Sequence, residues 1–239
     1  MELDPFGRAI RDHHRGERTH PLVDRDGGAT REHPIERFYF EPVADDPDLG
    51  WVESWLSGPL LETGAGAGRH ALYFQECVET VATDVSRDLV AVMDDRGVDD
   101  ARRANMFSLR DTFDDDRFRS VFARGTQACL ADSAARLRRF LADLAAVTTA
   151  DGTAVIDGFD PGHERAPELF GHRPDPEAGV ARRVYHQAYE GEVGKTLSFR
   201  LFGPDRLRAA ADAGWHVADV RRGDPRTPHY QAALSKSTG

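Results

Sequence analysis

Leu61-Glu62-Thr63-Gly64-Ala65-Gly66-Ala67-Gly68-Arg69 is the stretch of sequence that decides the fold. The apolar run over 59–63 predicts a short buried strand, and a helix is predicted over 68–76. Between them, glycines at 64, 66 and 68 permit a tight turn and a close approach of a ligand to the backbone. The free N–H groups at the helix start would face that ligand. This strand, turn and helix are typical of a doubly wound α/β sheet.

Strands and helices alternate on both sides of this stretch. Trp51, Val52, Trp55 and Leu56 form a helical face before it. After it we predict strands over 78–83, 102–106, 119–124 and 153–157. Between them we predict a helix over 87–96 and another that either Asp132 or Ser133 can cap. Asp151-Gly152 is expected to break the chain before the last of these strands. Five strands separated by helices imply a parallel sheet covered on both faces.

The two ends of the chain depart from this alternation. Residues 1–50 are polar and lack hydrophobic periodicity, except for the bulky cluster 35–40, and are expected to form a cap segment. Residues 51–239 form the main domain, with a lid-like insertion over 160–203. That insertion holds a loop and then a hairpin of strands 182–189 and 196–202 around the turn 190–194. A helix over 204–213 and strands 215–220 and 229–234 complete the chain.

Asp84 is the second feature with chemical meaning. It stands twenty residues after Gly64, at the end of the second predicted strand, where a carboxylate can accept hydrogen bonds from both hydroxyls of a ribose. Dinucleotide-binding proteins share this spacing, but their fingerprint is G-x-G-x-x-G/A. Here Arg69 occupies the place of the third glycine, and Glu62 precedes the first one.

The pattern Glu62-x-Gly64-x-Gly66-x-Gly68, with Asp84 after the next strand, resembles motif I of the class I S-adenosylmethionine-dependent methyltransferases. The resemblance covers about residues 50–160 and 204–234. It implies a doubly wound, mostly parallel sheet of seven strands. The last strand, over 229–234, would be antiparallel and inserted beside the fifth, with 215–220 at the edge.

The resemblance also implies which residues hold S-adenosylmethionine. The glycines would lie against its methionine part, Glu62 near its amino group, and Asp84 at its ribose. The full implied set is Glu62, Gly64, Ala65, Gly66, Gly68, Arg69, Asp84, Val85, Asn105, Met106, Phe107, Arg124 and Gly125. Tyr39, Gln127 and His186 are the candidates to face the substrate, and only one of Tyr185 and His186 can do so because neighbours in a strand point to opposite faces. No residue is assigned as a catalytic base.

The activity implied is in-line transfer of a methyl group to a nitrogen or oxygen nucleophile of a small molecule. Methyltransferases that act on macromolecular nitrogens often carry prolines after the fourth strand, whereas this chain has Gly125-Thr126-Gln127-Ala128. Two alternatives stay open. One is a sensor or assembly subunit that binds S-adenosylmethionine without catalysis, and the other is an NAD-type oxidoreductase.

The net negative charge of the chain limits which partners it can bind and indicates the kind of cytoplasm it comes from. The net charge is −10, Asp outnumbers Glu, and Lys195 and Lys236 are the only lysines. Such a surface repels phosphate backbones, so nucleic acid is not expected as a partner, and it is typical of proteins from a salt-rich cytoplasm. No apolar run reaches the roughly 18–20 residues of a membrane span. Neither His13-His14 nor the two cysteines have the clustered partners of a metal site. The oligomeric state is left open.

Overall fold

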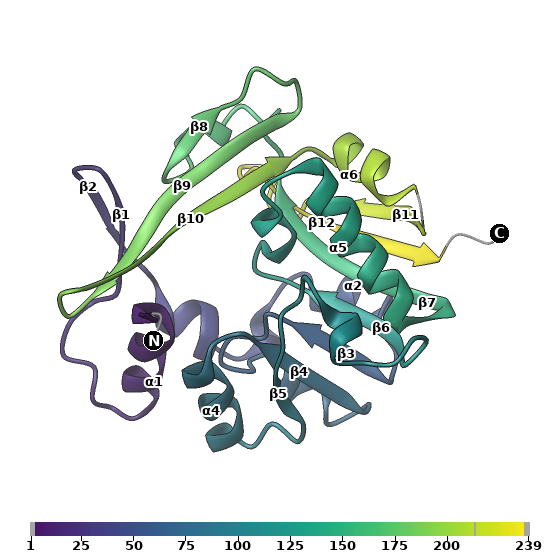
Figure 1. Ribbon diagram of the computed structural model, residues 1–239, viewed down its shortest axis with the longest axis horizontal. Coiled ribbons are helices and arrows are strands. Elements are labelled where there is room, and N and C mark those ends of the chain that lie inside the picture. The colour runs from purple at the N-terminus through teal and green to yellow at the C-terminus, as the bar shows by residue number, and fades with distance from the viewer. Residues whose placement is uncertain (1–2, 213, 237–239) are drawn as a thin grey trace.

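The chain folds around two sheets, which the computed structural model describes over residues 3–212 and 214–236 (Figure 1). The main sheet has seven strands in the order β11-β12-β7-β6-β3-β4-β5. Their bounds are Leu60–Thr63 for β3, Thr80–Asp84 for β4, Ala101–Arg103 for β5, Phe118–Ala123 for β6, Thr148–Phe159 for β7, Trp215–Arg221 for β11 and His229–Lys236 for β12. Strands β3 to β7 run parallel, and β12 is antiparallel to both β7 and β11. The predicted doubly wound α/β sheet with an inserted antiparallel last strand is confirmed.

Helices cover both faces of this sheet. They are α2 (Leu49–Glu53), α3 (Ala71–Phe74), α4 (Arg87–Arg96), α5 (Ala134–Val147) and α6 (Pro204–Ala211). Leu61 belongs to the core under α5 and α6, while its neighbour Leu60 belongs to the core under α2 and α3. Strand residues are therefore buried on both sides, which explains why the strands are near-continuous apolar runs in the sequence.

Helix ends follow the predicted signals closely. The Ser86 hydroxyl accepts a hydrogen bond from the Leu89 N–H at 3.2 Å, and Gly97 ends α4 in the left-handed conformation with φ +87°. Ser133 caps α5 in the same way through Arg136 N–H. Helix α3 is shorter than predicted, and the predicted end of α6, Ala213, lies outside the described residues.

The second sheet is built from two segments that the main sheet does not use, one within residues 23–32 and one within residues 172–202. It contains β1 (Val23–Asp26), β2 (Ala29–Glu32), β8 (His172–Pro174), β9 (Val180–Tyr189) and β10 (Glu192–Phe202), in the order β10-β9-β1-β2 with β8 on the free part of β9. We call these five strands the cover sheet. Figure 1 shows β9 and β10 arching from the region of α6 towards the N-terminal helix α1 (Pro5–His14).

The local structure differs from the sequence analysis at three places. The N-terminal segment contains α1, which Asp4 caps by accepting a hydrogen bond from Gly7 N–H at 2.9 Å. Strand β7 continues through Asp151-Gly152, although its register with β6 shifts there, and a Cβ on Gly152 would lie 2.8 Å from the Arg119 carbonyl oxygen of β6. Strand β5 ends at Arg103, so residues 104–106 belong to the following loop.

Candidate functional site

The glycine-rich turn lies at the carboxyl edge of the main sheet, where the strand order reverses on either side of β3. Ligands of open α/β sheets bind in the crevice at this point. Gly64, Gly66 and Gly68 all have positive φ, at 66°, 60° and 74°. A Cβ on Gly64 would collide with the Gln127 side chain, and one on Gly66 would lie 3.1 Å from the ring of Tyr39. Gly64 and Gly66 therefore form the floor on which two of the predicted substrate-facing residues lie.

At Gly68 the absence of a side chain is required by packing against α4 rather than by the site. A Cβ there would lie 2.7 Å from Val98 and 3.0 Å from Met93, which belong to α4 and the turn that follows it. The third glycine thus allows the turn to pack closely against α4. The N–H of Gly68 donates to the carbonyl of Ala65 at 3.0 Å, which closes the turn between the floor glycines and the helix.

Glu62 is a buried acid directly before the turn. Its side chain lies in β3 and is 3% exposed. One carboxylate oxygen, Oε1, lies 3.3 Å from Nδ1 of His70, while Oε2 and the Nε2 atom of His70 are buried and have no hydrogen-bond partner. An unpartnered buried carboxylate oxygen is costly, so this position is suited to a ligand that supplies a hydrogen-bond donor.

Asp84 lies across the turn from Glu62, at the end of β4. Its Oδ2 accepts a hydrogen bond from Gly66 N–H at 3.2 Å, and its Oδ1 accepts one from Ser86 N–H at 2.9 Å. Burial raises the pKa of this carboxyl to about 6, and the backbone hydrogen bonds oppose that rise. Each oxygen keeps a free lone pair, so the carboxylate can still accept hydrogen bonds from two hydroxyls. Beside it, Val85 is 55% exposed, an apolar side chain open to a flat apolar group.

The residues after β5 divide between surface and core. Asn105 is exposed, and its Oδ1 accepts a hydrogen bond from Phe107 N–H at 3.0 Å. Met106 is only 8% exposed, and its sulfur accepts a hydrogen bond from the Thr63 hydroxyl. Phe107 packs against Phe140 of α5. Met106 and Phe107 thus belong mainly to the wall of the core, while the amide of Asn105 stays accessible.

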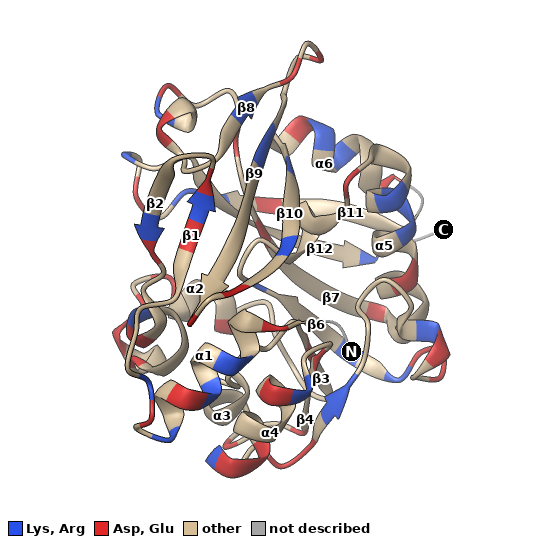
Figure 2. Ribbon diagram, turned by 60° about the vertical axis from the view of Figure 1, so that its left-hand side comes forward, with Lys and Arg blue, Asp and Glu red and all other residues tan. Residues whose placement is uncertain are grey.

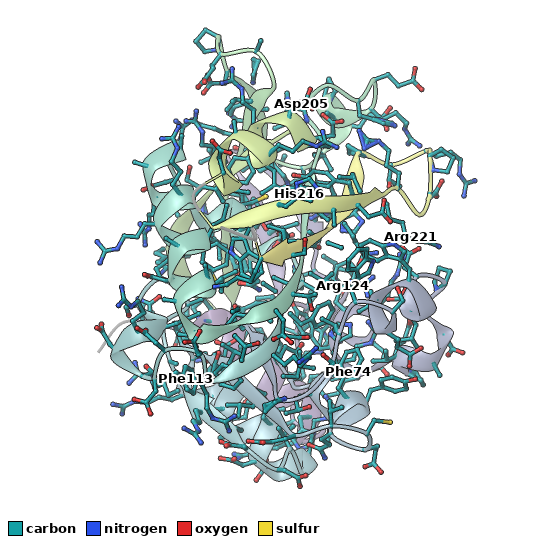
Figure 3. The ribbon with its side chains drawn as sticks, turned by 90° about the vertical axis from the view of Figure 1, so that its right-hand side faces the viewer. Phe74, Phe113, Arg124, Asp205, His216 and Arg221 are labelled. Carbon is teal, nitrogen blue, oxygen red and sulfur yellow. The ribbon has the colours of Figure 1, made fainter. Side chains whose placement is uncertain are left out.

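Arg69 and Arg124 hold the N-terminal part of the chain in place. Arg69 donates to the carbonyls of Glu41 and Pro42, at 2.6 and 3.1 Å. Arg124 forms an ion pair with Asp46, and Arg221 donates to Asp48 at 2.6 Å. Figure 3 shows Arg124 and Arg221 on the side of the molecule where the segment before α2 lies. Their guanidinium groups are committed to these partners, which the resemblance did not indicate.

The turn after β6 is fixed by an acid that the sequence did not reveal. Asp157, near the end of β7, accepts hydrogen bonds from Gly125 N–H at 3.1 Å and Thr126 N–H at 2.6 Å. Its Oδ2 also lies 2.9 Å from Nε2 of His229. Held in this way, Gln127 donates from Nε2 to the carbonyl of Gly64 at 3.3 Å. This bond brings Gln127 to the glycine floor, and its contact with a substrate stays a prediction.

The cover sheet turns one face of β9 towards the main sheet. Along β9, Arg183, Tyr185 and Gln187 are buried, whereas Arg182 and His186 are partly exposed on the other face. The guanidinium of Arg183 lies 5.5 Å from the ring of Phe159 at the end of β7, so the buried face is the inward one. The expectation that His186 faces the substrate is therefore wrong, and Tyr185 takes the inward position.

Tyr39 joins the site from the N-terminal segment. It lies in a single π-helical turn, Glu36–Phe40, and its ring lies against Gly66. Its hydroxyl is 3.2 Å from Nε2 of His33, and Nδ1 of His33 is 3.3 Å from Oδ1 of Asp24. Burial raises the pKa of Tyr39 well above the usual value for a phenol. Sequence reasoning missed Asp24 and His33, because nothing in a polar stretch shows that a hairpin will bring them together.

Solved structures of other proteins share this architecture. A methyltransferase from Bacteroides fragilis, described as S-adenosylmethionine-dependent and in complex with S-adenosylhomocysteine, superposes with a TM-score of 0.78 at 24% identity, over 98% of this chain and 95% of that one. The chain has the fold of S-adenosylmethionine-dependent methyltransferases. The cover sheet is included in this agreement, since almost the whole of both chains is matched.

More distant structures match a smaller part of the chain. The sugar N-methyltransferase KedS8 from Streptoalloteichus has a TM-score of 0.52 at 22% identity, over 72% of this chain and 78% of that one. The glycopeptide N-methyltransferase MtfA has a TM-score of 0.55 at 19% identity, over 78% and 84%. No family model matches the sequence, and no curated protein matches it either.

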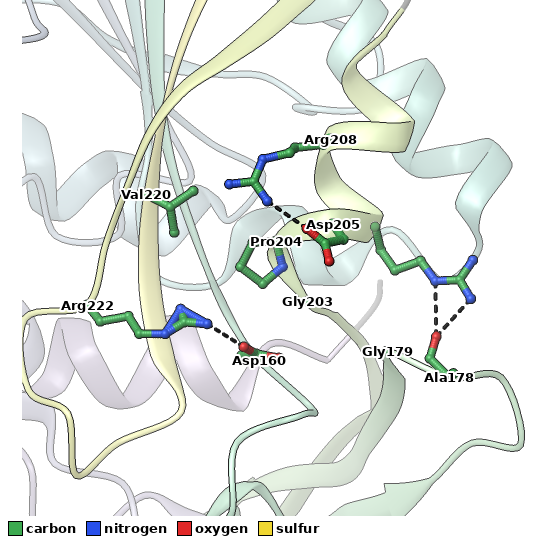
Figure 4. Close-up of a pocket in the computed structure, with 10 residues that line it drawn as sticks. Asp160, Ala178, Gly179, Gly203, Pro204, Asp205, Arg208, Val220 and Arg222 are labelled. Carbon is green, nitrogen blue, oxygen red and sulfur yellow. Dashed lines mark hydrogen bonds and ion pairs between the residues drawn. The ribbon is translucent and has the colours of Figure 1, made fainter.

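A separate cavity of about 760 Å³ opens near the start of α6 (Figure 4). Its charged side chains already have partners. Arg222 donates to Asp160 at 2.5 Å, Arg208 to Asp205 at 2.7 Å, and Arg206 to the Ala178 carbonyl at 2.8 Å. This cavity is not lined by the glycine floor, Glu62 or Asp84, so we do not place the chemistry there.

Proposed function

We propose that this protein binds S-adenosylmethionine at the glycine floor and transfers its methyl group to a small molecule. The observation that carries the proposal is the arrangement of the turn between its two acids. Gly66 donates its N–H to Asp84 on one side, and Glu62 presents a buried oxygen without a partner on the other. Within the methyltransferase fold this arrangement lies at the crevice where ligands bind.

The chemistry of these residues fits the parts of the cofactor. The free oxygen of Glu62 is suited to the cationic amino group of the methionine part. The remaining lone pairs of Asp84 are suited to the two ribose hydroxyls, and the exposed side chain of Val85 to the apolar face of adenine. Gly64 and Gly66, without side chains, let the methionine part approach the backbone. Asn105 offers its amide near the same edge.

S-adenosylmethionine supplies an electrophilic methyl group on a sulfonium, so the protein's task is to align an acceptor and exclude water. Orientation alone can lower a barrier by about 7–11 kcal/mol in favourable cases. Tyr39 and Gln127, which lie against Gly66 and Gly64, are the residues that would position the acceptor. The inward face of β9 would close the pocket over it and strengthen its electrostatics.

A small acceptor with a nitrogen or oxygen nucleophile is favoured by two features. The cover sheet roofs the carboxyl edge with buried side chains, which leaves little room for a macromolecule. The turn after β6, Gly125-Thr126-Gln127-Ala128, lacks proline. Two proteins of the same fold are named as N-methyltransferases of a sugar and of a glycopeptide, which supports an acceptor of this general kind.

Methyl transfer can be tested with radiolabelled S-adenosylmethionine and a panel of small amines, alcohols and phenols. We expect label to appear in at least one acceptor, and we expect Gln127→Ala to reduce that transfer. Gln75→Ala is the matched control, because this partly buried amide at the end of α3 bonds only the backbone of Gly97 and Asp99, away from the glycine floor. Binding of the cofactor with no transfer to any acceptor class would contradict the enzymatic part of the proposal and favour a sensor or assembly subunit.

We further propose that the protein works in a salt-rich cytoplasm. It carries a net charge of −10 and only two lysines, and its acidic side chains are spread over helices and loops around the molecule (Figure 2). Cys77 and Cys129 are both free thiols, which suits a reducing compartment. Within the described residues no helix is long and apolar enough to cross a membrane.

A further inference from the structure

Three side chains from the N-terminal segment form a hydrogen-bonded row that ends at the glycine floor. Asp24 lies on β1 and His33 just after β2, so the hairpin brings them together, with Oδ1 and Nδ1 3.3 Å apart. The π-helical turn then folds Tyr39 back over His33, where the two rings stack with centroids 5.9 Å apart and the hydroxyl reaches Nε2 at 3.2 Å. The row therefore depends on β1, β2 and the π-helical turn together.

The far end of the row is a well-anchored carboxylate. Asp24 is fully buried, and it also accepts hydrogen bonds from Arg31 at 2.9 Å and from Gln187 of β9 at 3.4 Å. Burial alone would raise its pKa, but the hydrogen bonds from His33 and Arg31 outweigh this and hold the pKa below the usual value. Asp24 is thus an anion fixed in place on the inward face of the cover sheet.

The direction of the hydrogen bonds follows from this anion. A carboxylate can only accept, so Nδ1 of His33 carries the proton that points at Asp24. In the neutral imidazole Nε2 then has a lone pair and accepts the hydroxyl proton of Tyr39. Burial raises the pKa of Tyr39, so the phenol keeps this proton before reaction. Its remaining oxygen lone pairs are free to accept a hydrogen bond from another group.

We propose that Tyr39, His33 and Asp24 form a proton relay that receives the proton of the methyl acceptor. This inference rests on the proposed function. As the acceptor nitrogen or oxygen bonds to the methyl carbon and the carbon–sulfur bond of S-adenosylmethionine breaks, the acceptor's proton passes to the Tyr39 oxygen. The original hydroxyl proton of Tyr39 moves to Nε2 of His33, and Asp24 stabilises the resulting imidazolium. Tyr39 stays neutral throughout, and His33 later releases its proton to solvent.

In this account Tyr39 is the catalytic residue, and His33 and Asp24 act through it. The titratable and charged groups that face the row from neighbouring elements are Arg31 on β2, Arg183 and Tyr185 on β9, and Asp84 on β4. The relay implies an acceptor that is protonated on its nucleophile when it binds, such as an amine N–H or a hydroxyl, rather than one that is already an anion.

The direct test combines turnover and cofactor binding in the full-length protein. Tyr39→Phe is expected to lower kcat about 10²- to 10⁴-fold, the usual contribution of general acid–base catalysis, with the Kd for S-adenosylhomocysteine nearly unchanged. Tyr73→Phe removes an exposed phenol that bonds Glu53 and is expected to change neither value. In Asp24→Asn and in His33→Gln, kcat is also expected to fall while the Kd for S-adenosylhomocysteine stays nearly unchanged. Wild-type turnover in Tyr39→Phe, or loss of cofactor binding in that variant, would overturn the relay.

Nitrogen-15 NMR of the imidazoles tests the row without any acceptor, using His33→Gln to assign the signals. We expect His33 as the Nδ1–H tautomer, with an Nε2 resonance that moves in Tyr39→Phe and not in Tyr73→Phe. An Nε2–H tautomer would overturn the relay even if the protein methylates. If S-adenosylhomocysteine does not bind the wild type, the proposed function fails, and the NMR result still decides whether the row has the direction inferred here.

Discussion

At the scale of single residues, the burial of Asp84 favours its protonated form, whereas binding two ribose hydroxyls requires the ionised carboxylate. The raised pKa, about 6, means that this acid holds its proton to a higher pH than an ordinary aspartic acid. Above about pH 6 the ionised carboxylate is available to accept two ribose hydroxyls, and as the pH falls below 6 that capacity is lost. We therefore expect the affinity for S-adenosylhomocysteine to weaken between about pH 7.5 and pH 5, measured by calorimetry.

Replacing the same side chain separates its role as an acceptor from its role in the fold. Asp84→Asn is expected to reduce affinity by about 1.5–3 kcal/mol, roughly 10- to 100-fold, and to flatten the dependence on pH. Asp94→Asn changes an exposed acid near the end of α4 and serves as the matched control. Unchanged affinity in Asp84→Asn would mean that the carboxylate serves only Gly66 and Ser86.

Three residues that sequence reasoning assigned to one site lie close together in the unit formed by β3, α3 and β4. Glu62, Gly64 and Asp84 meet because β3 and β4 are adjacent and parallel, which the alternating pattern predicts. The residues it missed meet through local geometry that no sequence pattern indicates. Asp157 reaches the N–H of Gly125 from the adjacent strand β7, and His33 meets Tyr39, six residues later, because the π-helical turn folds the chain back.

At the scale of elements, the N-terminal segment differs most from the sequence analysis, because it contains α1, β1 and β2. Strand β2 is exposed along its whole length, so it carries no hydrophobic signal, and it is held by pairing with β1 and by the contacts of Arg31 with Asp24 and Phe170. Helix α1 begins with a proline and is capped by Asp4. Its apolar face is short and interrupted by arginines and histidines, so the sequence shows no hydrophobic periodicity there. The main sheet could be predicted because its strands are buried on both faces, a pattern that an edge hairpin lacks.

Docking of α1 gives a prediction about stability. Ile10 is fully buried in a core with Leu22 of the N-terminal segment and Leu89 of α4. Ile10→Ala leaves a cavity there and is expected to lower the free energy of unfolding by about 2–5 kcal/mol in denaturant titrations. Leu3→Ala removes a side chain that is 56% exposed and should have almost no effect. Equal effects of the two substitutions would show that α1 is not docked as described.

At the scale of the whole molecule, the excess of carboxylates should make stability depend on salt. The net charge of −10 produces repulsion that salt screens, since the Debye length falls to about 3 Å at 1 M. We expect the unfolding temperature to rise as KCl is raised from zero to about 2 M, while glycerol at matched osmolality gives no comparable rise. A protein that is equally stable and active without added salt would contradict the proposed adaptation.

The central claim is that the fold binds S-adenosylmethionine at the glycine floor, and one measurement tests it most directly. It is calorimetry of the full-length protein in high salt with S-adenosylmethionine, S-adenosylhomocysteine and NAD. The turn between Glu62 and Asp84 predicts binding of both sulfur compounds and none of NAD, because Arg69 stands where a dinucleotide fold needs its third glycine. Binding of NAD and of neither sulfur compound would contradict the account.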